Sequence, residues 1–426
     1  MRTLYSLILL LMLPLILARL YWRGLRQRGY RENIGERFGL QSTPARKNCI
    51  WIHAVSVGET RAAEPLIRRL IALYPQHSIL LTSMTPTGRA TAVELFGDAV
   101  TCTYLPYDLV LLHQRLIEHY RPSLLLIMET EIWPNLLHAC KQNKVPAHLI
   151  NARMSEKSAR GYLRFALIRT LVMQALQTLC VVAVQSEADA NRFRKLGAKD
   201  IVVVGNIKFD VNLDAEIVQL GKSWRAGVRN RNVLLCASTR EGEEPLLLAA
   251  YTQVFNAAER VDTLLVIVPR HPQRFDQVAN DIERAGLRFS KRSQMILGAS
   301  REWPEVLLGD SMGEMAAYYA FCDVAVIGGS FLPLGGQNLI EACALGRPVI
   351  MGPSTFNFND VARLAVESGA MLPALDAFDA MRIAHRLLLD GEARKSMSSA
   401  GLELVATNRG ATKGMLALIN TALRKS

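Results

Sequence analysis

Three acidic side chains follow two apolar segments, at points where the chain is predicted to leave a strand. Glu59 comes after the run Cys49–Val55, and Glu129 and Glu131 come after Leu124–Met128. A carboxylate at the carboxyl end of a strand, beside a helix N-terminus, can accept a proton from an attacking hydroxyl group. Two carboxylates two residues apart could also bind a metal, orient a hydroxyl or stabilise positive charge on a sugar. The alternatives are a helix-dipole contact for Glu59 and solvated loop acids for Glu129 and Glu131.

Basic side chains follow other apolar segments and could hold an anionic substrate. Arg153 follows the run Ala147–Ile150, Arg270 follows the run Leu264–Val268, and Lys208 lies between the two halves of the chain. Each cation could pair with a phosphate or carboxylate group, and a solvated surface side chain is the alternative for each. If the leaving group carries one phosphate, such cations and helix N-termini could neutralise its charge without a metal ion.

No motif for a metal-assisted or hydrolytic site occurs in the chain. The sequence has no Asp-x-Asp pair for a metal-bound diphosphate, no P-loop, no GxSxG elbow and no HExxH motif. The seven cysteines lack CxxC spacing and mostly lie in or beside apolar runs, which indicates reduced core residues. We therefore expect neither a metal ion nor another cofactor.

The segment 328–342 has the densest pattern for nucleotide binding. Its four glycines follow an apolar run, and Glu341 lies one turn into the next predicted helix. Glycines let the backbone approach a ligand, a helix N-terminus can face a phosphate, and a carboxylate can accept hydrogen bonds from ribose hydroxyls. Backbone packing alone is the alternative. Residues 309–315 could also offer backbone N–H groups to an anion, and residues 237–244 carry a helix-capping pattern.

The elements that would position these groups alternate between short aliphatic runs and amphipathic stretches. In Arg61–Leu73, Leu66, Ile67, Leu70 and Ile71 fall on one face of a helix. Strands separated by such helices predict parallel sheets with both faces covered. We predict strands at Cys49–Val55, Ile79–Met84, Leu124–Met128, Ala147–Ile150, Leu179–Val184, Ile201–Val204, Val233–Ala237, Leu264–Val268, Val306–Leu308, Val324–Ile327 and Val349–Met351.

The chain is long enough for two domains. Its 426 residues exceed what one core usually holds, and polar residues in Asp214–Asn232 interrupt the alternation, so we place the boundary near 205–230. The predicted fold class is α/β with two Rossmann-like, doubly wound domains facing a cleft, which is the GT-B architecture. We assign residues 1–39 to a membrane anchor and basic segment, 40–215 to an acceptor-side domain and 216–426 to a nucleotide-sugar-binding domain.

The N-terminal segment combines an apolar run with basic residues. Leu4–Ala18 is almost wholly apolar, and residues 1–39 hold seven arginines and two glutamates, a local charge of +5 within a total of +12. This pattern predicts an uncleaved signal anchor or a helix inserted in one leaflet, with the following chain on the cytoplasmic side beside anionic lipid. A buried core helix is the alternative. We expect no nucleic-acid partner, because the charge forms no basic stripe with interleaved aromatics.

Taken in order, these motifs resemble the 3-deoxy-D-manno-octulosonic acid (Kdo) transferase family, which glycosylates the lipid A precursor. The likeness covers most of the chain and rests on HAVSVGE, TSMTPTG, YLPYD, METEIWPN, NARMS, GNIKFD, STREGEE, VPRHPQRF, GDSMGEM, GGSFLPLGGQNLIEA and MGPSTFNF. The resemblance implies an inverting GT-B glycosyltransferase of lipopolysaccharide biosynthesis that moves Kdo from CMP-Kdo to lipid IV-A. It also implies a place on the cytoplasmic face of the inner membrane.

The resemblance also implies site residues. Glu59 of SVGE would be the proton acceptor, and Glu129 of METE and Lys208 of GNIKFD would assist the transition state. CMP would be held by Pro269, Arg270, Met312, Gly313, Glu314, Asn338, Leu339, Ile340 and Glu341. Two positions depart from the family's commonest pattern, since Gln337 and Arg240 both stand where His is usual. Both side chains can donate hydrogen bonds, but Gln337 cannot titrate near neutrality, so the pattern does not support a protonated imidazole there.

Two other functions fit parts of the pattern. A GT-B nucleotide-sugar 2-epimerase would account for the nucleotide site, but it would need no lipid and would leave the basic, apolar N-terminus unexplained. A non-catalytic lipid-surface binding protein would bind its ligand but would release no CMP in the presence of an acceptor. The epimerase would use a uridine donor, so the nucleotide sugar that is consumed and the products that are formed distinguish the three functions.

Overall fold

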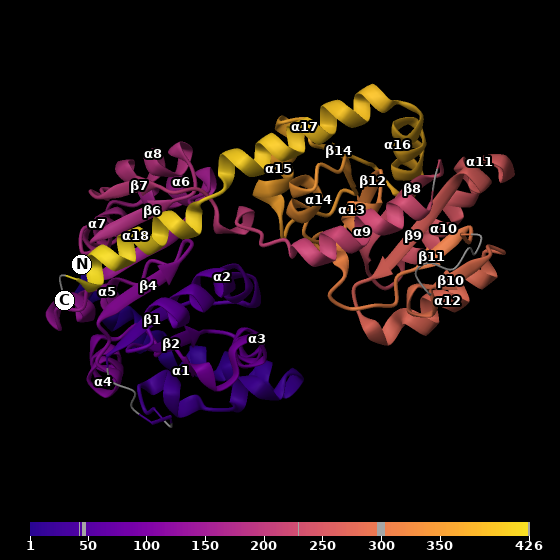
Figure 1. The fold of residues 1–426 in the computed structure, drawn as a ribbon. Coiled ribbons are helices and arrows are strands. Elements are labelled where there is room, and N and C mark those ends of the chain that lie inside the picture. Colours follow the sequence, from indigo (N-terminus) through magenta and orange to yellow (C-terminus); the bar gives the residue numbers. More distant parts are fainter. Residues whose placement is uncertain (42, 45–47, 229, 296–302, 425–426) are drawn as a thin grey trace. The chain divides into compact units, whose positions relative to one another are not determined.

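The computed structural model describes residues 1–41, 43–44, 48–228, 230–295 and 303–424. The chain divides into two compact units: unit 1 is Met1–Asp210 together with Arg409–Ser426, and unit 2 is Val211–Asn408. Each unit is built around one sheet whose faces are covered by helices (Figure 1). The predicted α/β class with two parallel sheets is confirmed.

The sheet of unit 1 has seven strands within the described residues, in the order β3-β2-β1-β4-β5-β6-β7, and all neighbours are parallel. The strands are β1 (Cys49–His53), β2 (Ser78–Ser83), β3 (Val100–Tyr104), β4 (Leu124–Met128), β5 (Ala147–Ala152), β6 (Val181–Val184) and β7 (Ile201–Val203). The order reverses between β1 and β4. Open α/β sheets bind ligands at such a switch point, beyond the carboxyl ends of the strands.

Helices cover both faces of this sheet. They are α1 (Arg2–Arg26), α2 (Val57–Leu73), α3 (Pro86–Phe96), α4 (Val110–Tyr120), α5 (Pro134–Gln142), α6 (Glu156–Arg164), α7 (Ala166–Leu176), α8 (Glu187–Lys195), α18 (Ala411–Leu423) and the short η1 (Arg28–Arg31), η2 (Ile34–Phe38), η3 (Gly97–Ala99) and η4 (Ile207–Phe209). One core contains Trp51 of β1 and side chains of α4, α5, α7 and α8, whereas Ile50 and Ile52 point to a second core with α2, α3 and α18. This alternation follows from the two-residue period of a strand.

Unit 2 also has a seven-stranded parallel sheet in the part of the chain that the structure describes, in the order β10-β11-β9-β8-β12-β13-β14. Its strands are β8 (Asn232–Thr239), β9 (Thr263–Pro269), β10 (Phe289–Lys291), β11 (Val306–Leu308), β12 (Val324–Ile327), β13 (Val349–Met351) and β14 (Met371–Pro373). Its helices are α9 (Ala215–Gly227), α10 (Glu243–Val254), α11 (Ala257–Asp262), η5 (Pro272–Arg274), α12 (Phe275–Arg284), η6 (Arg292–Gln294), α13 (Met315–Phe321), α14 (Ile340–Ala344), α15 (Asn359–Glu367), α16 (Ala377–Leu389) and α17 (Gly391–Asn408). Here the order reverses between β8 and β12, which defines the second switch point.

Three strands are absent from the sequence-based prediction: β3, β10 and β14. Each of them lies at an edge of its sheet. An edge strand pairs with one neighbour only, so it can carry polar or exposed residues. Thr101 and Thr103 interrupt the aliphatic pattern of β3, and Leu372 and Pro373 of β14 are exposed. Such strands lack the continuous aliphatic run that identifies a central strand.

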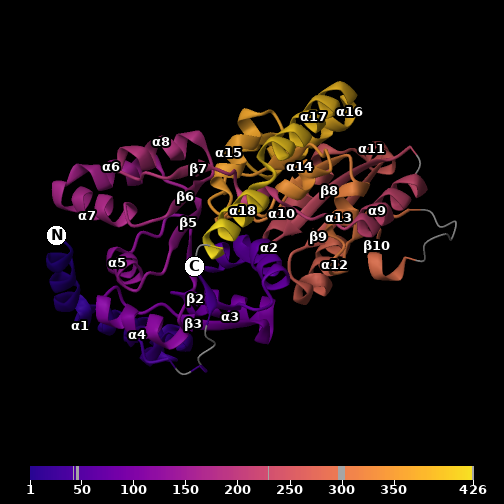
Figure 2. The same ribbon diagram turned by 60° about the vertical axis from the view of Figure 1, so that its left-hand side comes forward.

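The C-terminal end of the chain corrects the predicted domain assignment. Residues 216–426 were assigned to one domain, but α18 belongs to unit 1 (Figures 1 and 2). Ala411, Met415 and Ile419 of α18 are fully buried in the core that contains α2. The Asp210 carboxylate also accepts a hydrogen bond from the backbone N–H of Gly410 at 2.6 Å. Burial of one apolar helix face thus draws the last residues back to the first unit.

By length and composition, the N-terminal helix α1 could cross a membrane, since its most apolar 18-residue window has a mean hydropathy of 2.1. Only 6% of that window is buried in the protein, and Leu11 is 79% exposed. The alternative of a buried core helix is therefore wrong. The helix is compatible with the predicted membrane anchor.

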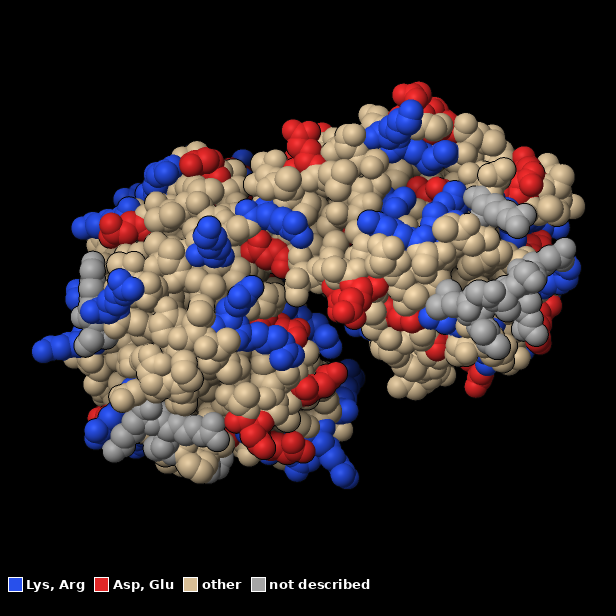
Figure 3. Space-filling model, in the orientation of Figure 1, with Lys and Arg blue, Asp and Glu red and all other residues tan. Residues whose placement is uncertain are grey.

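Charged side chains of both signs are interspersed on the face drawn in Figure 3. No single-sign stripe runs over the described elements on that face. One face does not test binding of nucleic acid, so the expectation of no such partner stays a prediction.

Candidate active site

The switch point of unit 1 carries two of the predicted catalytic acids. Glu59 lies in the first turn of α2, soon after β1, and Glu129 directly follows β4. The strands β1 and β4 are parallel neighbours, with His53 level with Ile127. Both acids therefore lie at the same edge of the sheet, as the strand pattern predicts.

The Glu59 carboxylate is held by its own loop. Its Oε2 accepts a hydrogen bond from the backbone N–H of Val55 at 2.8 Å, and its Oε1 accepts one from the Ser56 hydroxyl at 3.2 Å. Glu59 therefore stabilises the start of α2, in agreement with the alternative that it contacts the N-terminal end of this helix. Each carboxylate oxygen has a further lone pair, so these contacts leave the group able to accept a proton.

The environment of Glu59 tunes it toward proton transfer. Burial raises the pKa of Glu59 from 4.5 to about 7, and the charges of Glu129 and Glu131 act in the same direction, against the two hydrogen bonds just described. A carboxylate with a pKa near neutrality suits a general base. The nearby His53 is a poor competitor, because its side chain is fully buried and burial lowers its pKa to about 3.

Glu129 occupies a backbone conformation that residues other than glycine rarely adopt, with φ at +56°. Its N–H donates to the Ile150 carbonyl at 3.0 Å, and its Oε2 accepts from Arg153 Nε at 2.9 Å. Glu129 is only 8% exposed, so its interpretation as a solvated loop acid is wrong. Glu131 accepts a hydrogen bond from Trp133 Nε1 at 2.9 Å, and its pKa is raised by burial and by the charge of Glu129.

Lys208 is positioned by a chain of amide side chains. Asn151 at the end of β5 accepts at Oδ1 from the backbone N–H of Ile207 at 3.1 Å. Gln185 after β6 donates to the Asn151 carbonyl at 2.9 Å and accepts from Asn206 Nδ2 at 3.0 Å. These contacts tie η4, which carries Lys208, to the carboxyl ends of β5 and β6. The structure thus places Lys208 at the same sheet edge as Glu59 and Glu129.

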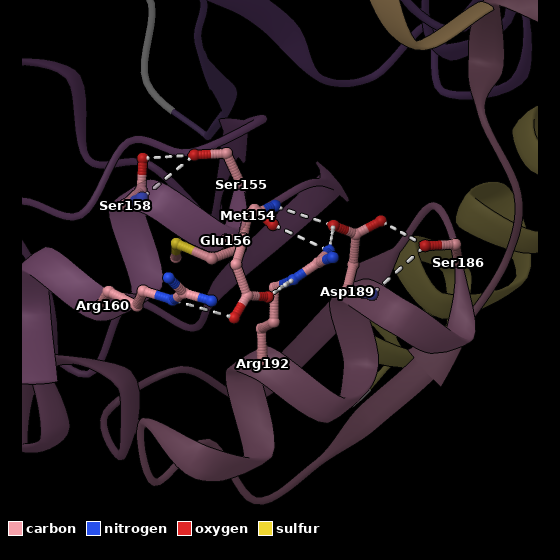
Figure 4. Close-up of polar contacts among 8 residues, drawn as sticks. All are labelled: Met154, Ser155, Glu156, Ser158, Arg160, Ser186, Asp189 and Arg192. Atoms are coloured by element: carbon pink, nitrogen blue, oxygen red, sulfur yellow. Dashed lines mark hydrogen bonds and ion pairs between the residues drawn. The ribbon is translucent and has the colours of Figure 1, made fainter. Parts of the chain in front are cut away.

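A second polar network fixes the loop after β5, which carries Arg153 (Figure 4). Asp189 Oδ1 accepts from the backbone N–H of Met154 at 2.9 Å, and Arg192 donates to the Met154 carbonyl at 3.0 Å. Both partners come from α8, so the backbone beside Arg153 is tied down on both sides of Met154. This network positions the loop so that the Arg153 guanidinium pairs with Glu129.

In unit 2, a fully buried carboxylate joins the two loops of the switch point. Glu243 accepts hydrogen bonds from the backbone N–H groups of Arg240 at 2.8 Å, Gly329 at 2.6 Å and Phe331 at 2.9 Å. It therefore links the loop after β8 to the glycine-rich loop after β12. The capping pattern predicted for residues 237–244 is wrong, because α10 begins after Gly242 without a side-chain cap.

The next residue, Glu244, forms a buried ion pair. It accepts from the Thr239 hydroxyl at 2.7 Å and from two nitrogens of the Arg274 guanidinium at 2.7 and 2.8 Å. Glu244 is fully buried and Arg274 is 9% exposed. The pair fixes η5 against α10 and thereby sets the course of the backbone that leaves Arg270.

Several cations gather at the ends of β8 and β9. Arg270 donates its backbone N–H to the Thr239 carbonyl at 2.9 Å, so Arg240 and Arg270 follow adjacent strand ends. Partial burial lowers the pKa of His271, and the charges of Arg240, Arg270 and Arg274 lower it too. Such a concentration of positive charge is suited to a phosphate or carboxylate.

The predicted nucleotide residues after β12 lie near these cations. Asn338 Nδ2 donates to Glu341 Oε1 at 3.1 Å. Burial raises the pKa of Glu341, whereas the hydrogen bond from Asn338 and the charge of Arg270 lower it. The structure therefore brings Arg270, Asn338 and Glu341 into one neighbourhood. The side chains of Leu339 and Ile340 are buried in the core, so only their backbone is available to a ligand.

The segment with Met312, Gly313 and Glu314 follows β11, the neighbour of β9. Met312 is 61% exposed, and Gly313 has a φ of +80°, which favours glycine. Glu314 Oε1 accepts from Arg292 at 2.9 Å, and the same guanidinium lies 4.6 Å over the Trp224 ring. The segment is therefore braced from η6 and α9 at the carboxyl end of the sheet of unit 2.

Sequence reasoning finds the residues at strand ends but misses the residues that brace them. Gln185, Glu243, Glu244 and Arg274 are not predicted as site residues, because each acts through a partner distant in the sequence. The only feature of the local sequence that indicates any of these residues is the pair of acids, Glu243 and Glu244, at the start of α10. Within the described residues, no group of three or more His, Cys, Asp or Glu is arranged to hold a metal ion. Metal independence stays a prediction.

Comparison with known proteins identifies relatives along the whole chain. A family model described as 3-deoxy-D-manno-octulosonic-acid transferase (kdotransferase) matches residues 32–211. The chain is 42% identical to the 3-deoxy-D-manno-octulosonic acid transferase of Bordetella pertussis, over 97% of this chain and 98% of that protein. It is 36% identical to the enzyme of the same name from Haemophilus influenzae, over 100% and 99% of the two chains. The crystal structure of a glycosyltransferase from Rickettsia africae, 14% identical, covers 89% of this chain and 100% of its own with a TM-score of 0.52, which is a likeness of fold.

Proposed function

Because this chain belongs to the 3-deoxy-D-manno-octulosonic acid transferase family, we propose that it transfers Kdo from CMP-Kdo to a hydroxyl group of lipid IV-A. We further propose that the configuration at the anomeric carbon is inverted, which corresponds to a single displacement. The observation that carries this proposal is Glu59, a carboxylate with a pKa of about 7 at the switch point of unit 1.

In the proposed reaction, an acceptor hydroxyl oxygen forms a bond to the anomeric carbon of Kdo. The bond between that carbon and the phosphate oxygen breaks, and its electron pair leaves with CMP. Glu59 takes the hydroxyl proton on an oxygen that keeps a free lone pair beside its contacts to Val55 and Ser56. A base with a pKa near the working pH combines a useful ionised fraction with a useful driving force.

Glu129 and Lys208 would assist the transition state from the same sheet edge. A carboxylate can stabilise the positive charge that develops on an oxocarbenium-like sugar, and an ammonium group can stabilise the departing phosphate or the Kdo carboxylate. The unusual backbone of Glu129 and its ion pair with Arg153 support this role, because strained positions are retained where function requires them. The amide chain that holds η4 supports the role of Lys208.

Unit 2 would bind the donor. Pro269 and Arg270 would contact the cytidine nucleotide after β9, residues 312–314 would do so after β11, and residues 338–341 after β12. Glu341 and Asn338 can accept and donate hydrogen bonds to ribose hydroxyls, and the gathered arginines can neutralise the single phosphate. We propose that no metal ion is needed, since these cations supply the charge that a metal would otherwise provide.

The apolar helix α1 supports a location at the cytoplasmic face of the inner membrane. Its basic last turn, with Arg23 and Arg26, would lie at the level of anionic headgroups. An enzyme held there meets an acylated acceptor without extracting it from the bilayer. Lipid A precursor, CMP-Kdo and anionic lipid are thus the partners that we propose.

The test is a product analysis. Purified protein in lipid or detergent is incubated with CMP-Kdo and lipid IV-A, and the lipid is examined by mass spectrometry with and without EDTA. We expect the lipid mass to rise by one or more Kdo units, CMP to be released, and EDTA to have no effect. Unchanged lipid together with epimerisation of a UDP-sugar in a parallel reaction would indicate a 2-epimerase, and CMP-Kdo binding without release of CMP would indicate a non-catalytic protein. Loss of activity with EDTA and its recovery with magnesium would disprove metal independence.

A further inference from the structure

The hairpin of α6 and α7 exposes apolar side chains on the surface of unit 1. Phe165, Leu167 and Ile168 are 55%, 56% and 41% exposed, and they are close together in the sequence at the junction of the two helices. We name these three residues the hairpin patch. Soluble surfaces seldom gather large apolar side chains in this way without a partner.

The C-terminal half of α7 is packed in the core, so α7 as a whole is not a misplaced core helix. Val172, Ala175 and Leu176 are buried in the core that contains α5 and α8. The helix therefore has its own core-facing side, towards its C-terminal end. The hairpin patch lies at the N-terminal end of α7 and is left outside.

Basic residues flank the hairpin patch in the sequence. Lys157, Arg160, Arg164 and Arg169 lie in residues 156–169 with one acid, Glu156, so four positive charges and one negative charge give a local +3. The Arg164 guanidinium lies 5.4 Å over the ring of Phe165. Long basic side chains beside exposed apolar groups fit an anionic lipid surface, since their stems cover apolar surface while their charges reach headgroups.

The hairpin patch is also connected to the membrane-length helix α1. The helix α5 packs against both α7 and α1, and the three elements lie on one side of unit 1 (Figure 2). Two hydrogen bonds fasten α1 there: Tyr5 donates to Asp108 at 3.0 Å, and Asn135 of α5 donates to the Ser6 hydroxyl at 2.9 Å. These contacts hold the N-terminal end of α1 against unit 1, so a bilayer that receives α1 in its headgroup plane would meet α5 and α7 on the same side.

We propose that the hairpin patch is a second lipid contact, inserted into the headgroup region of an anionic bilayer beside α1. The loop that ends in α6 carries Arg153, which pairs with Glu129. Insertion of the hairpin would thus hold the strand-end acids of unit 1 at headgroup level. The lipid contact itself does not depend on the proposed transfer reaction, but its value for catalysis rests on that function.

The direct test places an environment-sensitive fluorophore on the hairpin patch. Cys180 is the one exposed cysteine and the other six are buried, so Cys180→Ser gives a background for labelling a single introduced cysteine. Full-length protein carrying Leu167→Cys is reconstituted with vesicles of phosphatidylethanolamine and phosphatidylglycerol. Leu375→Cys is the matched control, because Leu375 is 83% exposed but lies in unit 2 beside acidic Asp376.

We expect the label at position 167 to shift to the blue and to be quenched by lipids brominated near the headgroup, and the label at 375 to do neither. A second variant, Arg164→Glu with Arg169→Glu, should weaken the response at 167 on the order of ten-fold or more. Its fold is checked by circular dichroism and by CMP affinity.

Protein that sediments with vesicles while its 167 label stays water-exposed would overturn the proposal. A response that grows with protein concentration in the absence of vesicles would also overturn it, and would indicate contact between two copies of the chain. These readouts need neither donor nor acceptor, so they are independent of product formation. A fully active enzyme without lipid insertion would refute the contact alone, and insertion by an inactive enzyme would refute the function alone.

Discussion

The two sheets end in the same local arrangement and use their carboxylates in opposite ways. In each unit a strand at the switch point leads through a short loop into a helix with acids in its first turn. In unit 1, Glu59 is partly exposed, is held only by its own loop, and lies near other acids. In unit 2, Glu243 and Glu244 are fully buried and are bound by three backbone N–H groups, a hydroxyl and a guanidinium.

The difference lies in the partners. A carboxylate surrounded by donors and a paired cation is committed to holding loops together, and removing it leaves buried groups without partners. A carboxylate near like charges, with few donors, keeps a proton affinity that is useful near neutral pH. Glu59 is thus suited to proton transfer, while Glu243 and Glu244 hold loops together and leave the ligand to other side chains.

The largest effect should come from Glu59→Gln. If Glu59 is the proton acceptor, its loss is expected to lower kcat by about 10³-fold, within the usual range for a general base. CMP affinity is expected to stay unchanged, because the proposed donor-binding residues are in unit 2. Steady-state kinetics and calorimetric CMP titration measure the two effects. Glu64→Gln is the matched control, since Glu64 is on the same helix in a surface pair with Arg68. Wild-type turnover in Glu59→Gln would show that Glu59 is not the proton acceptor, so its contrast with the bracing acids Glu243 and Glu244 would not hold.

The next largest effect should be on the stability of unit 2. Glu244→Ala leaves the Arg274 guanidinium buried without its partner, which typically costs about 3–5 kcal/mol. Hydrogen exchange of the Glu244→Ala variant should be faster only within unit 2. Glu241 is an exposed acid of the same loop, so Glu241→Ala should leave hydrogen exchange unchanged. The pair Glu244→Met with Arg274→Met should recover part of the loss, because it removes both charges. A variant with normal protection but no turnover would mean that Glu244 is catalytic instead.

A smaller effect is expected from Arg270, a proposed ligand residue of unit 2. Arg270→Ala should weaken CMP binding about 10- to 100-fold, the usual value of a hydrogen bond to a charged group, and should raise KM for the donor more than it lowers kcat. Arg284→Ala, whose side chain is 79% exposed on α12, is the control. Titration of CMP at two salt concentrations checks the charge contribution. Equal affinity of the variant and the wild type would remove Arg270 from the donor site.

Sequence patterns suffice for the central strands and for the side chains at their ends. A strand buried on both faces must be aliphatic throughout, so β4 and β12 are identified directly, and the next polar residues must lie at the carboxyl edge. Edge strands such as β10 have no such constraint and were missed. The return of α18 to unit 1 was also missed, because an apolar helix face does not specify which core buries it.

The candidate site could be predicted as a set of positions but not as a division of roles. The segments HAVSVGE and STREGEE look alike, since both place acids between a strand and a helix. Their roles differ because Glu243 meets Gly329, 86 residues away, and Glu244 meets Arg274, 30 residues away. No local spacing rule relates such residues, so only the fold reveals which acids are already bound.

The last prediction concerns the pH dependence that Glu59 imposes on both activity and stability. Its pKa is about 7 in the folded chain against an ordinary value of 4.5. Between these values the folded chain holds a proton that the unfolded chain has lost, so the stabilisation by protonated Glu59 is lost as the pH rises through 7. Activity has the opposite sign, because only the ionised carboxylate accepts a proton, so kcat/KM should fall about ten-fold per pH unit below 7.

Glu59→Gln should separate these two effects. The neutral amide cannot act as a base, but it also avoids the cost of an ionised group among Glu129 and Glu131. The full shift corresponds to roughly 3 kcal/mol, and partial exposure of Glu59 reduces our expectation to about 1–2 kcal/mol of added stability at pH 8, with little difference near pH 4. Urea unfolding of both proteins at the two pH values measures it, with Glu64→Gln as control. If the variant is less stable than the wild type at pH 8, the hydrogen bonds from Val55 and Ser56 outweigh the repulsion, and Glu59 is a bracing acid like those of unit 2.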